Sequence, residues 1–173
     1  MITIFTPDCN TISQEYYDET ISSLEFCTLL CTCKHYGCLT KHAYYHRKLK
    51  TESGGLKLKI CRVKCSVCGR THALLLSCIV PYSQVSLADQ VAITSCEVST
   101  GKHTNIMEVN PDIDESCISY IIHQYRRYWK QRLLSEAILL TPVAILIKNC
   151  FLAFKRHFMQ IRGTPNIIYL KPT

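Results

Sequence analysis

The sequence predicts an α+β protein in which a small β-hairpin zinc ribbon is followed by an all-α helix-turn-helix bundle. Cysteines recur at close spacing over residues 31–38 and again over 65–68. Between these two groups, apolar and basic residues alternate on either side of a turn, which is typical of a β-hairpin. After residue 86, the apolar residues instead follow the period of a helix.

These changes of pattern divide the chain into three predicted segments. An N-terminal extension covers residues 1–25, the zinc ribbon covers 26–80, and the helical domain with the helix-turn-helix covers 81–173. The extension opens with a short apolar strand, Ile2 to Phe5, and contains no chemical motif.

The predicted hairpin runs from Ala43 to Leu49 and returns from Leu56 to Val63, around the turn residues 51–55. Leu56, Leu58 and Ile60 share one face of the returning strand, but Val63 and Cys65 have the other parity. We therefore expect a β-bulge near residues 60–62.

The cysteines indicate a metal site. The chain has 12 Cys among 173 residues. Its first residues lack the charged and apolar segments of a secretory signal, so disulfides are not the expected use. Cys65-Ser-Val-Cys68-Gly69 has the spacing of a zinc knuckle, in which one tight turn supplies two thiolates.

The second pair of ligands is less well defined, because Cys31, Cys33 and Cys38 compete for two places. We favour Cys33 and Cys38, since Cys31 and Cys33 are separated by one residue and their joint ligation of one ion is strained. Cys31 in place of one of them is the alternative. Four thiolates leave no open position, so we expect one structural Zn²⁺ per chain and no catalysis.

The helical part begins with a capping box, Ser86 with Asp89. A short helix is predicted at Thr104 to Glu108, and a long one follows the turn at Asn110-Pro111, with Asp112 or Asp114 as its cap. Apolar residues on this long helix recur at helical spacing from Ile118 to Leu133. A last helix is expected from Pro142 to about Met159.

The two predicted helices around Asn110-Pro111 fit a helix-turn-helix, whose second helix enters the major groove of DNA. Exposed residues near its start would read bases, and basic residues further along would contact phosphates. With three residues of the ribbon, the predicted DNA contacts are Ser116, Ser119, Tyr120, His123, Arg126, Arg127, Lys130, Lys57, Lys59 and Arg47.

Charge is concentrated in the ribbon. Residues 34–70 contain ten Lys or Arg against one Glu, whereas residues 1–33 contain five acidic residues and no basic one. Such a basic segment attracts a polyanion, because neutralised phosphates release counterions. We expect double-stranded DNA as the partner. No membrane partner is expected, since the longest apolar run, 11 residues from Ala137 to Ile147, is too short to span a bilayer.

Four segments of the chain resemble a bacterial family of unknown function that is labelled transposase-like or mobile-element-associated. They are Cys-x-Cys-x4-Cys-Leu-x-x-His-Ala-Tyr-Tyr-x-Arg (31–47), Arg-Val-Lys-Cys-x-x-Cys-Gly-x-Thr-His-Ala-Leu-Leu (62–75), Ile-Val-Pro-Tyr-Ser-Gln (79–84) and Phe-Met-Gln-Ile-Arg-Gly-Thr-Pro-Asn (158–166). The resemblance implies an N-terminal zinc ribbon, a helix-turn-helix and DNA binding in a bacterial cytoplasm. It differs at Leu76, where the family pattern has Pro.

The predicted function is therefore a zinc-stabilised DNA-binding protein, acting as a transcriptional regulator or an accessory factor of a mobile element. A zinc-ribbon module that binds a protein or RNA is the alternative, with Tyr44, Tyr45 and His46 as candidates for stacking on bases. A transposase or recombinase is disfavoured. Four of the seven acidic residues after residue 80 crowd into residues 108–115, away from any strand that could bring them to one site. The last helices either close the core or form a homodimer interface.

Overall fold

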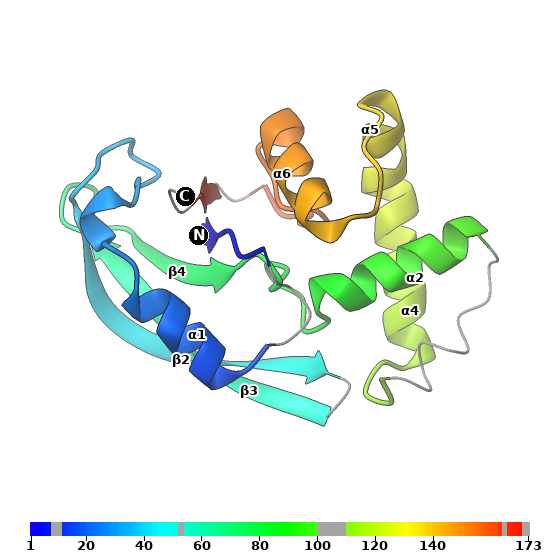
Figure 1. The fold of residues 1–173 in the computed structure, drawn as a ribbon, viewed down its shortest axis with the longest axis horizontal. Coiled ribbons are helices and arrows are strands. Elements are labelled where there is room, and N and C mark those ends of the chain that lie inside the picture. Colours follow the sequence, from blue (N-terminus) through cyan, green and yellow to red (C-terminus); the bar gives the residue numbers. More distant parts are fainter. Residues whose placement is uncertain (8–11, 52–53, 100–109, 164–165, 171–173) are drawn as a thin grey trace.

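A mixed five-stranded sheet with the strand order β2-β3-β4-β1-β5 forms the centre of the structure. This computed structural model describes the chain except residues 8–11, 52–53, 100–109, 164–165 and 171–173. Figure 1 shows the sheet with its long curved hairpin on one side and most of the helices on the other. The strands are β1 Ile2–Ile4, β2 Leu39–Thr51, β3 Gly54–Cys65, β4 Thr71–Leu76 and β5 Ile167–Tyr169.

The prediction of a single hairpin followed by an all-α bundle was wrong. β1 pairs in parallel with both β4 and β5, so residues from the two ends of the chain extend the hairpin into one sheet. Ile2 and Ile4 of β1 and Leu74 to Leu76 of β4 are buried, as expected for strands covered on both faces. Parallel strands that pair with each other lie far apart in sequence, and no local sequence pattern predicts such a pairing.

The hairpin itself was predicted correctly, and its bulge lies close to the expected place. β2 and β3 are longer than predicted at both ends and pair in antiparallel register from Leu39 with Cys65 to Thr51 with Gly54. The register shifts between Lys41 and Ala43, opposite Val63 and Arg62. The extra residue is therefore on β2, the strand opposite the one whose parity changes.

Helices cover the sheet and form a group beside it. Their bounds are α1 Gln14–Ser22, α2 Leu87–Ser99, α4 Glu115–Gln124, α5 Lys130–Ser135 and α6 Val143–Phe154, with a short 3₁₀ turn η1 at Phe26–Thr28. The predicted cap at Ser86 is confirmed: Ser86 Oγ accepts from the Asp89 N–H and donates to Asp89 Oδ2 at 2.7 Å. None of the helices in the described part of the chain is long and apolar enough to cross a membrane.

The long helix predicted from residue 113 is present in modified form. Asp114 caps α4 by accepting from the N–H of Cys117, and a π-helical turn η2, Tyr125–Trp129, joins α4 to α5. Buried Trp129 packs edge-on against Phe154 and Phe158, with ring centroids 5.9 and 5.3 Å apart. The first helix of the predicted helix-turn-helix, Thr104 to Glu108, lies outside the described residues.

Buried Tyr17 of α1 connects the two halves of the sheet. β3 and β4 pair only over Arg62–Lys64 and Thr71–Ala73, after which β4 continues alongside β1. At this fork the Tyr17 hydroxyl accepts from the Cys61 N–H (2.8 Å) and donates to the Leu74 carbonyl (2.9 Å). One phenol thus satisfies two buried backbone groups that no longer face each other.

Tyr17→Phe is expected to lower the free energy of unfolding by about 1–3 kcal/mol, because it leaves both backbone groups buried without a partner. Urea unfolding followed by circular dichroism measures this change. Tyr36→Phe serves as the control, since that side chain is 66% exposed. Equal stability of the two variants would contradict the bridging role.

Candidate metal centre

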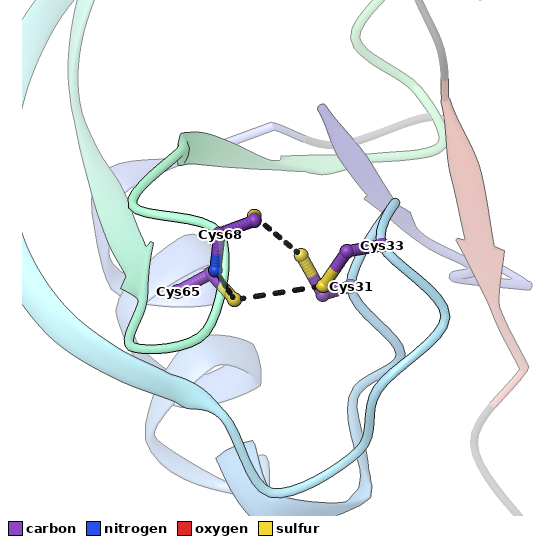
Figure 2. Close-up of side chains that lie close together, drawn as sticks. All are labelled: Cys31, Cys33, Cys65 and Cys68. Atoms are coloured by element: carbon purple, nitrogen blue, oxygen red, sulfur yellow. Dashed lines mark hydrogen bonds between the residues drawn. The ribbon is translucent and has the colours of Figure 1, made fainter.

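Four thiols from two separate loops converge at the end of the hairpin. The Sγ atoms of Cys31, Cys33, Cys65 and Cys68 all lie within 4.8 Å of one another. Cys31 Sγ is 3.7 Å from Cys68 Sγ, and Cys33 Sγ is 3.7 Å from Cys65 Sγ (Figure 2). Sulfurs around a tetrahedral ion at a metal–sulfur distance of about 2.3 Å would lie about 3.8 Å apart. The group therefore has the dimensions of a tetrahedral metal site.

One pair of thiols comes from the knuckle that connects β3 to β4. The Cys65 N–H donates to the Arg70 carbonyl, and the Gly69 N–H donates to the Cys65 carbonyl. Gly69 has a φ of +69°, which glycine adopts without strain. This tight turn directs the Cys68 N–H to Cys65 Sγ, at 3.4 Å. The predicted pair Cys65 and Cys68 is thus placed as a knuckle requires.

The other pair comes from the loop that precedes β2. The Lys34 N–H donates to the Cys31 carbonyl at 2.8 Å, which closes a turn around Cys31 and Cys33. Within this turn both thiols point to the same side, towards the knuckle (Figure 2). The separation by one residue, which argues from sequence against joint ligation, is accommodated because the backbone turns between the two cysteines.

Cys38, which the sequence favoured over Cys31, lies outside the group of four. Its thiol donates to the His35 carbonyl at 3.2 Å, and its own carbonyl accepts from the Ser66 N–H at 2.8 Å. Cys38 therefore connects the two loops through its backbone. The structure brings together the alternative set, with Cys31 in the place of Cys38.

Hydrogen bonding and burial shift the pKa values of the cysteines in these two loops in opposite directions. A hydrogen bond from the Cys68 backbone N–H lowers the pKa of Cys65 to about 6. Burial raises the pKa of Cys33 to about 12 and that of Cys38 to about 11. A metal ion bound among closely spaced cysteines would favour their thiolate forms, because its positive charge offsets the repulsion between the sulfurs.

The predicted DNA-contacting residues lie on two surfaces. Lys57 and Lys59 are exposed on β3, whereas half-buried Arg47 donates to the carbonyls of Val80 and Ser83 and holds that loop. The remaining seven are exposed on the helix from α4 to α5: Ser116, Ser119, Tyr120, His123, Arg126, Arg127 and Lys130.

The predicted DNA contacts did not include Lys48, and His46 was named only as a candidate for stacking on bases. Lys48 lies directly opposite Lys57, and His46 lies directly opposite Lys59. All four are exposed, as is Tyr44, whose ring lies 4.5 Å from the Lys59 ammonium. The period-two alternation on both sides of the turn was the signal that could have identified this set.

Comparison with known proteins places the chain in a family. A family model described as a domain of unknown function, DUF6431, matches residues 31–119. The chain belongs to the DUF6431 family. The match includes both cysteine loops, strands β2 to β4 and the first turn of α4. No curated protein and no solved structure matches the chain. The DUF6431 description states no reaction, ligand or partner.

Elemental analysis of the reduced protein is expected to find about one metal ion per chain. Cys31→Ser should lose most of this metal, because serine does not supply a thiolate. Cys38→Ser should keep it, since that thiol is bonded to the His35 carbonyl instead. Retention of metal by Cys31→Ser together with its loss from Cys38→Ser would contradict the assignment.

Proposed function

We propose that this DUF6431 protein is a zinc-stabilised DNA-binding protein. The metal assignment is supported by the chemistry of the ligands, since four thiolates in a tetrahedral group with two knuckle-like loops are typical of structural Zn²⁺. Zinc would hold the loop before β2 against the turn after β3. The hairpin would thereby be anchored at one end, and its basic face would lie along the strands beyond this anchor.

The main observation in support of DNA binding is that positively charged side chains face each other across the two strands of the hairpin. We call the exposed set Tyr44, His46, Lys48, Lys57 and Lys59 the hairpin face. Like charges directly opposite each other destabilise an antiparallel pair, so Lys48 facing Lys57 is a cost to folding. Among the described residues, neither ammonium forms an ion pair with a carboxylate. A polyanion that binds both would offset this repulsion.

The surroundings of the hairpin face define its limits. Strands β2 and β3 contain eight Lys or Arg and no Asp or Glu. At the far end of the hairpin, Lys50 donates to Cys117 Sγ at 3.0 Å, so the first turn of α4 adjoins it. Asp112 and Asp114 also lie there, which makes this end unfavourable for phosphate. The phosphate track is therefore expected to run along Lys48, Lys57 and Lys59.

The helix from α4 to α5 is the second surface of the proposal. Arg126, Arg127 and Lys130 would contact phosphates, and Ser119 and His123 would approach base edges. A role as a regulator or an accessory factor of a mobile element rests on the sequence resemblance. The DNA proposal itself rests on the hairpin face and the exposed helix.

The double variant Lys48→Ala/Lys57→Ala is expected to weaken binding to duplex DNA uniformly across sequences. It should reduce the slope of log K against log[salt] by about 2, because each lost phosphate contact contributes about 1. Fluorescence anisotropy with a labelled duplex, over a range of salt, gives both quantities.

The matched control is Lys148→Ala/Lys155→Ala, which removes the same charge from exposed positions at α6. Equal losses in both double variants would indicate a non-specific response to net charge and contradict a hairpin interface. Single-stranded RNA and an acidic polypeptide serve as competitors. If either competitor binds more tightly than duplex DNA, that competitor and not DNA is the partner.

Selection from a random duplex library tests the helix. If His123 reads a base edge, His123→Ala should relax the selected preference at one position by about 1–3 kcal/mol while changing the salt slope little. If the parent protein selects no preferred sequence from the library, the helix does not recognise bases, and the protein binds only the DNA backbone.

A further inference from the structure

His72 lies beside the metal centre but is not one of its four thiols. It is 4% exposed on β4, opposite Val63 of β3. Its Nε2 atom lies 3.3 Å from Cys31 Sγ, which is the distance of a hydrogen bond between a ring N–H and a thiolate. The imidazole therefore faces the sulfur of Cys31, the cysteine that the sequence analysis gave only as an alternative ligand.

The chain places His72 and the knuckle on one structural unit. Cys65 and Cys68 come from the turn between β3 and β4, and His72 is the second residue of β4. Pairing of Lys64 with Thr71 and of Val63 with His72 fixes the backbone at this point. Cys31, by contrast, belongs to the loop before β2. A bond from His72 to Cys31 thus connects the knuckle to the opposite loop.

Thiolate ligands need donors as well as the metal ion, because each sulfur keeps lone pairs and negative charge. Cys65 Sγ has such a donor in the Cys68 N–H. Cys31 Sγ is buried, so water does not take this role, and His72 Nε2 is placed to do so. Cys38 lacks this arrangement, since its thiol is directed at the His35 carbonyl.

We propose that His72 is a positioning residue of the metal centre, which donates its Nε2–H to the Cys31 thiolate and thereby selects Cys31 over Cys38 as the fourth ligand. This inference rests on the proposed zinc occupancy of the four thiols and is independent of DNA binding. It also assigns the imidazole a place outside the ligand set, so the centre has four sulfur ligands and no nitrogen ligand.

The test measures Zn²⁺ affinity of the full chain by competition with a chromophoric chelator. His72→Phe keeps a ring but removes the donor, and it should weaken Zn²⁺ binding by about 10- to 100-fold. His72→Gln keeps a side-chain N–H and should recover much of this loss. His42→Phe, at an exposed position of β2, is the matched control and should bind as the parent protein does.

Cobalt substitution provides a readout that a purely structural role would not change. Bound Co²⁺ should show the sulfur-to-metal charge-transfer intensity of four thiolates in the parent protein. Loss of the hydrogen bond should shift this band in His72→Phe but not in His42→Phe. If His72→Phe does not fold, His72→Gln carries the comparison, with a smaller loss of affinity and a smaller shift expected.

A double variant shows whether the effect acts through Cys31. In a Cys31→Ser background, His72→Phe should have little further effect on Zn²⁺ affinity, since the accepting thiolate is already absent. An undiminished effect would overturn the proposal, as would equal Zn²⁺ affinity of His72→Phe and the parent. A nitrogen ligand in the parent spectrum would overturn it too. Failure of the parent protein to bind any metal would instead overturn the zinc centre itself.

Discussion

The convergence of Cys31 and Cys33 with Cys65 and Cys68 is the constraint on which the rest of the structure depends. It joins the loop before β2 to the turn after β3, at the point where the hairpin begins and ends. β4 leaves the knuckle and within a few residues changes its partner from β3 to β1. The position of the knuckle therefore also determines where the parallel half of the sheet starts.

The same arrangement explains why the hairpin can carry opposed lysines. A hairpin is only marginally stable by itself, and repulsion between Lys48 and Lys57 weakens it further. Packing of Leu58 and Ile60 into the core offsets part of this cost, and a metal ion bound by the four thiols would anchor the other end of the hairpin.

Local features were predictable from the sequence because local interactions determine them. The Cys65-x-x-Cys68-Gly69 knuckle, the antiparallel pairing of β2 with β3, the Ser86 cap and the Asp114 cap each involve residues that are close in sequence. The parallel pairings of β1 could not be predicted in the same way. They bring Ile2 beside Leu74 and Ile167, and short buried apolar segments do not encode which partner they take.

The choice between Cys31 and Cys38 illustrates the same limit at the metal centre. Spacing along the chain favoured Cys33 with Cys38, because it ignores how the backbone turns. The Lys34 N–H closes the turn that places Cys31 beside Cys33, and the buried His72 that contacts Cys31 is 41 residues away in sequence. Only the pairing of β3 with β4 brings that imidazole to the loop before β2.

X-ray absorption at the zinc edge of the full chain, purified under reducing conditions, tests the four-thiolate centre directly. We expect a first shell of four sulfur atoms at about 2.3 Å and no nitrogen or oxygen ligand. A mixed sulfur and nitrogen shell, or protein that contains no metal after reconstitution with Zn²⁺, would contradict it.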